Sequence, residues 1–195
     1  MSSKKEQLEI LKQEAEKCRD CELGGLRNKL VFSDGNSDAR IVLIGEAPGA
    51  EEDKTGFPFV GRAGKLLDEF LNSVGITREN DIYIMNTLKC RPPQNRDPLP
   101  SEKVACRKFF DKQLDIIKPD IILLCGAVAM KSLMEGKLAI SKVRGQWFDG
   151  PGGAKMMPIF HPSYLLRNHR VVEGSPRWLM FEDMKEIKRV YDGVE

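Results

Sequence analysis

The sequence predicts an α/β protein, a three-layer α/β/α sandwich around a central four-stranded parallel sheet. Four short aliphatic runs have the composition of buried strands. Between them lie longer segments in which apolar residues recur every three or four positions, as in amphipathic helices. Strands that alternate with helices pair in parallel and are covered by helices on both faces. The order of the segments therefore predicts this fold class.

The elements follow one another regularly. A first helix is predicted over residues 4–17, where Leu8, Leu11 and Ala15 share one face, and residues 18–38 read as irregular chain. The strands are predicted at 41–44, 82–85, 121–124 and 156–160. The remaining helices are predicted at 62–74, 100–117, 127–134 and 175–191, and long loops follow the first two strands.

Length and composition predict one domain, residues 1–195, with segment 1–38 packed on it. The net charge of +2 excludes a bulk polycation, but cations concentrate locally and suit a phosphate-binding face. These cations are Lys89, Arg91, Arg96, Lys103, Arg107, Lys108, Arg167, Arg170 and Arg177. No apolar run approaches the ~20 residues of a membrane span, and no apolar signal region follows Met1. We therefore expect a cytoplasmic protein whose cysteines are reduced.

Four of the five cysteines are candidate metal ligands. Cys18 and Cys21 have the C-x-x-C spacing, and 15 residues separate Cys90 from Cys106. Four thiolates suit either zinc or an iron–sulfur cluster, and the spacing does not separate the two. The alternative is four unrelated buried thiols. Cys125 lies in an aliphatic run and is expected to pack in the core.

A pocket is predicted where the first strand ends. Residues 41–44 run directly into Gly45-Glu46-Ala47-Pro48-Gly49, followed by further acids at 51–53. Ligands of parallel sheets sit beyond the carboxyl ends of the strands, so Asn86 and His161, which follow two other strands, should lie at the same edge. Phe59 in the first long loop is a candidate for stacking on a flat ligand. The competing interpretations are a loop-capping Asn86, a structural His161 and a core Phe59.

These residues together resemble one family. The loop 45–49 with Glu52-Asp53, Asn86, the four cysteines, and His161-Pro162-Ser163-Tyr164-Leu165-Leu166-Arg167 are similar to the family 4 uracil-DNA glycosylases, the iron–sulfur branch of their superfamily. The similarity runs from Cys18 to the last helix. It implies a hydrolase that excises uracil from DNA by hydrolysing the N-glycosidic bond, leaving an abasic site for base excision repair. It also implies a [4Fe–4S] cluster on Cys18, Cys21, Cys90 and Cys106, with zinc as the alternative.

The resemblance implies roles for individual side chains. Uracil is expected to contact Glu46, Ala47, Pro48, Phe59, Asn86 and His161, and the catalytic residues are expected to be Glu46, Glu52 and His161. The Asn86 amide can accept from uracil N3–H and donate to O4, a pattern that cytosine reverses. Glu52 is expected to crowd the C5 position and exclude the thymine methyl group. DNA is expected to contact Ser163, Arg167, Arg91, Arg96 and Leu165, the last as a wedge, with core packing as its alternative.

One position departs from the wider superfamily. Other branches carry Asp or Asn, which positions the attacking water, where this chain has Ala47. Glu46 and Glu52 are the nearest carboxylates, and an oxocarbenium-like sugar needs little activation of water.

Two other functions remain open. A covalent uracil-binding relative would carry a histidine in the basic loop after the third cysteine, and residues 91–98 have none. A non-catalytic iron–sulfur DNA-binding module would bind without turnover. The expected partner is uracil-containing DNA, single- or double-stranded, met by a monomer near the nucleoid of a prokaryotic cell. No motif identifies a sliding clamp or polymerase partner.

Overall fold

Four parallel strands form the centre of the sheet in the computed structural model, which describes residues 2–136 and 138–193. They are β2 (Ile41–Gly45), β3 (Ile82–Asn86), β4 (Ile121–Cys125) and β6 (Lys155–Ile159), in the order β3-β2-β4-β6. Every residue of β2, β3 and β4 is buried, because helices cover both faces. Gly45 pairs with Asn86, so the ends of β2 and β3 lie side by side.

The sheet has six strands, not the four that the sequence predicts. The short strand β1 (Asp34–Gly35) pairs antiparallel with β3, and β5 (Phe148–Asp149) pairs antiparallel with β6. Both additions lie at the edges of the sheet. Two residues are too few to show an alternating pattern, so these strands leave no periodic signal in the sequence.

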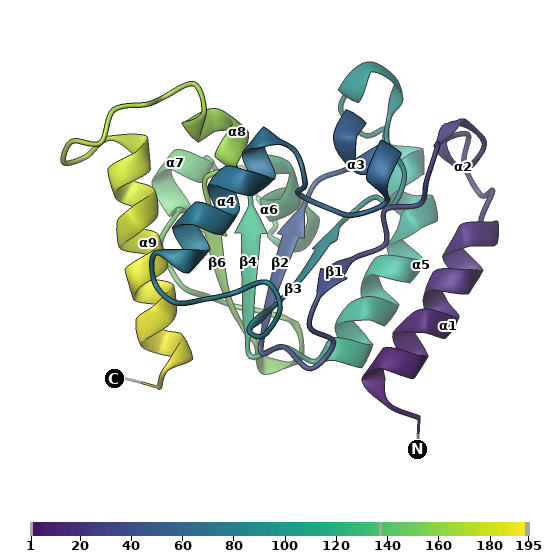
Figure 1. The fold of residues 1–195 in the computed structure, drawn as a ribbon, viewed down its shortest axis with the longest axis horizontal. Helices are drawn as coiled ribbons and strands as arrows, with labels where there is room; N and C mark the ends of the chain where they lie inside the picture. Colours follow the sequence, from purple (N-terminus) through teal and green to yellow (C-terminus); the bar gives the residue numbers. More distant parts are fainter. Residues whose placement is uncertain (1, 137, 194–195) are drawn as a thin grey trace.

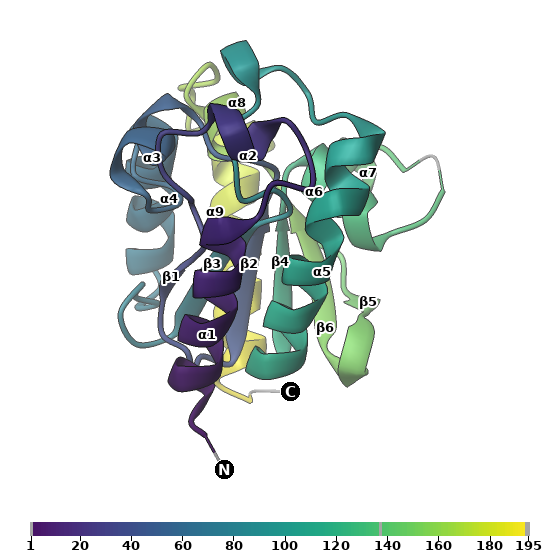
Figure 2. The same cartoon turned by 90° about the vertical axis from the view of Figure 1, so that its right-hand side faces the viewer.

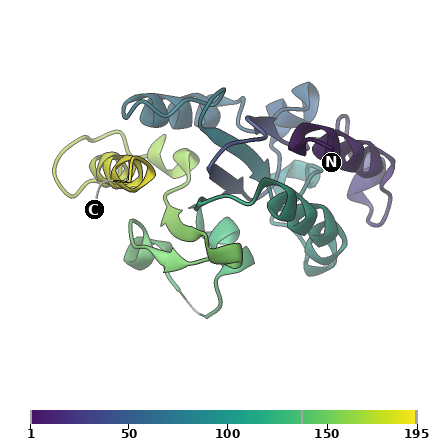
Figure 3. The same ribbon diagram turned by 90° about the horizontal axis from the view of Figure 1, so that it is seen from below.

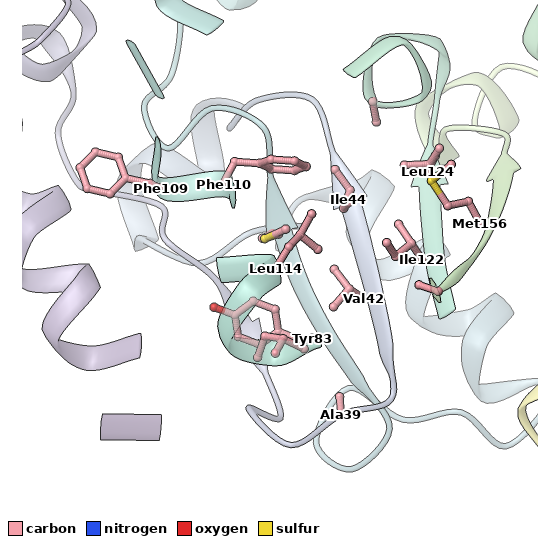
Figure 4. Close-up of a cluster of buried hydrophobic side chains, with 14 of the residues drawn as sticks. Ala39, Val42, Ile44, Tyr83, Phe109, Phe110, Leu114, Ile122, Leu124 and Met156 are labelled. Atoms are coloured by element: carbon pink, nitrogen blue, oxygen red, sulfur yellow. The ribbon is translucent and has the colours of Figure 1, made fainter. Parts of the chain in front are cut away.

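One face of the sheet is covered by α1 (Lys4–Lys17), α5 (Pro100–Ile117), α6 (Ala127–Leu133) and α7 (Ile140–Val143). Helices α1 and α5 lie side by side in front of the sheet (Figure 2). Figure 4 shows the cluster that they bury, in which Phe110 and Leu114 of α5 meet Val42, Ile44 and Tyr83 of the strands. Helix α1 therefore packs on the sheet together with α5.

The other face is covered by α4 (Arg62–Asn72), α8 (Pro162–Leu165) and α9 (Pro176–Tyr191). The end-on view shows helices on both sides of the sheet (Figure 3). Strand residues alternate between the two layers, so that Ile41 and Leu43 face this cluster while Val42 and Ile44 face the other. The predicted three-layer sandwich is thus confirmed.

Several short helices lie in segments predicted as loops. They are α2 (Leu23–Leu26), α3 (Ala50–Thr55), η1 (Pro93–Asn95) and η2 (Pro151–Gly153). The arrows of the parallel strands point toward the edge at which α2, α3 and α8 are found (Figure 1). None of the helices within residues 2–136 and 138–193 has both the length and the apolar character that crossing a bilayer requires.

Candidate active site

A cavity of ≈ 350 Å³ opens at the carboxyl edge of the sheet. It is lined by Glu46, Ala47, Pro48, Gly49, Glu52, Phe59, Ala63, Gly64, Asn86, Pro92, Asn95, Arg96, Asp97, His161 and Ser163. All the residues expected to contact uracil are among them. Their elements are far apart in the sequence, and the parallel order of β2, β3 and β6 brings their ends together.

Asn86 ends β3 and is 3% exposed. Its side-chain amide bonds to no other described residue and lines the cavity. The loop that it was alternatively expected to cap is held by other groups, since Thr87 N–H donates to the Gly45 carbonyl and Leu88 N–H to the Glu46 carbonyl. A buried amide without a protein partner is a group suited to reading a ligand.

Gly45 makes room for this amide. A Cβ atom at Gly45 would overlap Asn86 Oδ1 and lie 2.8 Å from the Phe59 ring. Any larger residue here would push Asn86 or Phe59 out of position. The glycine that ends β2 therefore allows the amide and the aromatic ring to share one cavity.

Phe59 is buried and has a positive φ of 55°, a strained conformation for an aromatic residue. Arg78 holds this backbone, because its guanidinium donates to the carbonyls of Phe59 at 3.0 Å and Pro58 at 2.9 Å. The same guanidinium pairs with Asp34 and Asp68. Sequence reasoning missed Arg78, whose long-range contacts have no local signal. The Phe59 and His161 ring centres lie 5.8 Å apart.

His161 caps the short helix α8. Its Nδ1 accepts from the Ser163 backbone N–H at 3.1 Å and lies 2.7 Å from Ser163 Oγ. Nδ1 therefore carries no proton in the neutral ring, and Nε2–H is the donor left for the cavity. Burial lowers the pKa of His161 below its ordinary value of 6.5, although the nearby Glu52 charge opposes this shift. The geometry and the pKa both favour a neutral imidazole that donates through Nε2.

The two candidate catalytic carboxylates, Glu46 and Glu52, differ in their hydrogen-bond partners. Burial raises the pKa of Glu46, Asp97 raises it further, and Lys103 lowers it. The Glu46 carboxylate bonds to no other residue in the described part of the chain. Glu52 Oε2 accepts from Gly49 N–H, and its Oε1 accepts from Val60 and Gly61 N–H, each at 3.1 Å. Glu46 is thus free to hold a ligand or water, whereas both Glu52 oxygens already hold the loop.

The residues expected to contact DNA lie in different settings. Ser163 and Arg96 line the cavity, and Arg167 is exposed. The Arg96 guanidinium is held by Glu102 at 2.5 and 2.9 Å, which offsets much of its charge. Arg91 donates to Asn95 Oδ1 at 2.8 Å.

Leu165 requires a correction. It is fully buried in the core cluster that α4 and α9 share, so it packs inside the protein and does not extend toward DNA as a wedge. The exposed apolar side chain of α8 is Tyr164, which contacts the Phe160 ring.

Five cavity residues were not singled out by sequence: Ala63, Gly64, Pro92, Asn95 and Asp97. The last three belong to the basic loop, and η1 turns them toward the cavity with positive φ at Gln94 and Asn95. The Asn95-Arg96-Asp97-Pro98 run is a turn signal in the sequence, but a turn signal does not show which cavity a loop reaches.

The four candidate cysteine ligands line a second, small cavity between α1, α2 and α5. Gly24 closes one wall, because a Cβ atom there would lie 2.6 Å from the Cys18 carbonyl oxygen. No three Cys, His, Asp or Glu side chains in residues 2–136 and 138–193 are positioned to hold one metal ion. The four thiols nevertheless line one cavity, so that segments far apart in the sequence bring all four candidate ligands together.

Two cations border this cysteine cavity. Arg27 Nη1 donates to Cys90 Sγ at 3.1 Å. Lys89 is fully buried, and this burial lowers its pKa to about 8 while Cys106 and Cys90 act in the opposite direction. Burial also raises the pKa of both Cys90 and Cys106. Two positively charged side chains, Lys89 and Arg27, therefore border the four candidate cysteine ligands.

The chain is similar over most of its length to several known proteins. The family model described as the uracil DNA glycosylase superfamily matches residues 32–185. A type-4 uracil-DNA glycosylase of Thermotoga maritima is 49% identical over 189 residues, 96% of each chain. One of Archaeoglobus fulgidus is 41% identical over 83% of this chain and 84% of that protein. A type-5 enzyme of Thermus thermophilus is 28% identical over 80% of this chain and 78% of that protein. With the cavity and four cysteines described above, these matches establish that the chain belongs to the type-4 uracil-DNA glycosylases of the uracil-DNA glycosylase superfamily.

Proposed function

We propose that this protein removes uracil from DNA by hydrolysing the N-glycosidic bond, leaving an abasic site that base excision repair then processes. The observation that carries the proposal is the meeting of Asn86, Phe59 and His161 in one cavity at the sheet edge. The type-4 relatives support the same activity. The target base must leave the helical stack to reach such a cavity, which costs a few kcal/mol.

Asn86 reads the base in this proposal. Uracil presents an N3–H donor between two carbonyl acceptors, and the Asn86 amide can accept from N3–H and donate to O4. Cytosine reverses this pattern and would leave a buried amide mismatched, at a cost of about 1–3 kcal/mol. Phe59 stacks on the ring, and the chain from Glu46 to Pro48 borders its O2 side. Glu52 borders C5, where it disfavours the methyl group of thymine.

His161 stabilises the departing base. As the glycosidic bond breaks, negative charge develops on the base and reaches O2. The Nε2–H of a neutral imidazole donates to that oxygen, and the fixed Nδ1 acceptor bond to Ser163 supports this tautomer. No proton transfer from the histidine is required, because uracil leaves as a stabilised anion.

Glu46 is our candidate for orienting the water that attacks the sugar. Its unpaired carboxylate and its position before Ala47 support this role. Glu52 contributes by holding the loop 49–61, and its charge also favours positive charge on the sugar. An oxocarbenium-like transition state accepts a weakly activated water.

The DNA backbone is held by Ser163 and Arg167, with Arg91 and Arg96 of the basic loop on the other side of the cavity. We expect uracil to be excised from both single- and double-stranded DNA by a monomer. Such an enzyme works where the chromosome lies, which in a prokaryotic cell is the cytoplasm. A sliding clamp as partner remains a prediction without a motif in this chain.

Cys18, Cys21, Cys90 and Cys106 are proposed to hold a [4Fe–4S] cluster, with zinc as the alternative metal. The shared cavity and the two bordering cations support this assignment. When bound, the cluster would link the N-terminal loop, the segment that follows β3, and α5. It takes no part in the cleavage that we derive from the side chains.

Incubation with a uracil-containing oligonucleotide followed by alkali tests the function. We expect strand scission at uracil and no scission of the matched thymine or cytosine oligonucleotide. An unbroken strand with retained affinity would instead indicate a binding module, and a complex that survives denaturant would indicate a covalent binder. Brown protein with absorbance near about 400 nm would identify an iron–sulfur cluster, and colourless protein with bound metal would identify zinc.

A further inference from the structure

Lys89 is among the largest of the fully buried side chains in the described residues. Its ammonium donates to the backbone carbonyl of Asn86 at 2.6 Å and lies 5.9 Å from the centre of the Phe32 ring. No carboxylate in residues 2–136 and 138–193 pairs with it. A buried ammonium with one neutral acceptor and one aromatic ring is poorly compensated, so its burial calls for an anion nearby.

Four thiolate ligands in the neighbouring cavity would supply that anion. Lys89 lines the same cavity as Cys18, Cys21, Cys90 and Cys106. Thiolate ligands are anionic, and a cluster held by four of them keeps net negative charge.

Arg27 is a second cation at this cavity, but unlike Lys89 it does not contact Asn86. One of its nitrogens donates to Cys90 Sγ at 3.1 Å, and another donates to the carbonyls of Ala15 and Glu16. Arg27 thus contacts the thiols and α1 without touching the uracil cavity. Lys89 contacts both sites, because its side chain runs from the cysteine cavity to the strand end that carries Asn86.

The chain between the two sites is short and fixed. Thr87 and Leu88 bond to the carbonyls of Gly45 and Glu46 in the uracil cavity, and the Lys89 carbonyl accepts from Val31 N–H at 2.9 Å. Residues 86–90 therefore join one wall of the uracil cavity to a candidate ligand. A structural change at the cysteine thiols would therefore reach the Asn86 backbone through residues 86–90.

We propose that Lys89 is a positioning residue that couples the metal-binding loops to the uracil-reading amide: its ammonium is neutralised by the thiolate ligands and holds the Asn86 main chain in place. This inference rests on the proposed function, since it takes the bound group to be a cluster and Asn86 to read uracil. Positive charge beside a cluster stabilises its reduced form, so Lys89 and Arg27 both raise its reduction potential.

The test uses the full-length, cluster-loaded protein and three variants. Lys89→Met removes the charge and the donor to Asn86, Arg27→Met removes a charge at the thiols alone, and Lys112→Met removes an exposed charge of α5 that pairs with Glu14. The potential is measured by voltammetry, and kcat and KM are measured on a uracil-containing oligonucleotide. We expect more negative reduction potentials for Lys89→Met and Arg27→Met than for the wild type.

We expect kcat/KM to fall about tenfold for Lys89→Met, with a clearly smaller loss for Arg27→Met. Lys112→Met should match the wild type in both.

The results separately test the charge pairing of Lys89 with the thiolates and its link to Asn86. An unchanged potential in Lys89→Met would overturn the charge pairing, and equal losses of kcat/KM in Lys89→Met and Arg27→Met would overturn the specific link to Asn86. Where Lys89→Met does not accumulate, Lys89→Gln carries the same charge loss and should show the same shift in potential. Brown wild-type protein that leaves uracil in place would refute the proposed function while the potentials still decide the charge pairing. Colourless wild-type protein that cleaves uracil DNA would refute this inference and leave the glycosylase assignment standing.

Discussion

Asn86 is the side chain whose replacement tests base reading most directly. Asn86→Asp replaces the amide donor with an acceptor, so the pairing with uracil O4 is lost. We expect uracil excision to fall by about ten- to a hundredfold, corresponding to about 1–3 kcal/mol, and cytosine to become a relatively better substrate. Rates on matched uracil and cytosine oligonucleotides measure the change. The control is Asn80→Asp, an exposed asparagine ahead of β3. A variant that keeps its full preference for uracil would contradict the role of Asn86.

The surroundings of His161 predict how kcat/KM changes at acidic pH. Burial depresses its pKa below 6.5, so the neutral, donating ring persists at pH 6.5 and is lost only as the pH falls further. Burial raises the pKa of Glu46 above its ordinary 4.5, so this carboxylate also becomes protonated on the acidic side. We therefore expect kcat/KM to be steady near pH 7 and to fall below pH 6.5.

Substitutions distinguish the contributions of His161 and Glu46 to the pH dependence of kcat/KM. His161→Gln should lower kcat and leave only the titration of Glu46. His169→Gln, at the other histidine of the chain, should leave the profile unchanged. Full activity with unaltered pH dependence in His161→Gln would contradict the proposed donor.

The loop from Gly45 to Gly61 depends on long-range anchors more than on its own sequence. Glu52 ties both ends of this segment through three backbone N–H groups, and Arg78 ties Phe59 from outside it. Asp53 anchors the loop to the N-terminal segment, since it accepts from the backbone and side chain of Asn28. The strained backbone of Phe59 persists because these contacts fix it.

Glu52→Gln distinguishes a loop anchor from a catalytic base. The variant keeps one carbonyl oxygen but turns an NH2 group toward a backbone donor, which costs about 1–3 kcal/mol. If Glu52 anchors the loop, KM should rise and the melting temperature should fall by several degrees. Glu51→Gln is the matched control, because Glu51 is exposed and pairs with Lys54 on the same helix. A large loss of kcat with unchanged KM and melting temperature would instead assign Glu52 to the chemistry.

The two core clusters share one sheet, so the molecule should unfold as a unit. Each strand of the parallel core contributes alternate residues to both clusters, and α1 is part of the same interior. One domain over residues 1–195 remains our prediction, and it implies a single cooperative unfolding transition.

Cys90→Ser tests how far this unit depends on its metal. Metal binding adds to folding free energy where ligands come from separate segments. We expect the variant to lose soluble yield and visible absorbance first, with activity lost in proportion to the folded protein. The amount of folded protein is measured by circular dichroism beside the uracil assay. Cys125→Ser is the contrasting variant: Cys125 is buried in β4 away from the cysteine cavity, so visible absorbance should persist even where stability falls. A stable, folded Cys90→Ser protein without activity would contradict a structural role for the cluster.

The sequence alone predicted the parallel core, its helices and most of the residues that line the cavity. The predictions of the fold and of the strand-end residues rest on local signals: the strand runs, the helical spacing, and polar residues directly after buried strands. Other cavity residues, such as Glu52 and Ser163, were expected because the sequence resembles the family 4 uracil-DNA glycosylases. Parallel pairing then requires the ends of the strands to meet at one edge. The motifs around Gly45, Asn86 and His161 could be recognised for the same reason, because each is contiguous in the chain.

Tertiary structure alone decided which of these residues remain available for chemistry. In the folded protein Leu165 packs in the core, and Arg96 is paired with Glu102. Both oxygens of Glu52 accept hydrogen bonds from the backbone, whereas the Glu46 carboxylate has no hydrogen-bond partner among the described residues. The tertiary structure also brings Arg78 to Phe59 and Lys89 between the thiols and Asn86. These properties depend on burial and on contacts between distant segments. Neither composition nor spacing records them, because a side chain's partners are set by the packing of the whole chain.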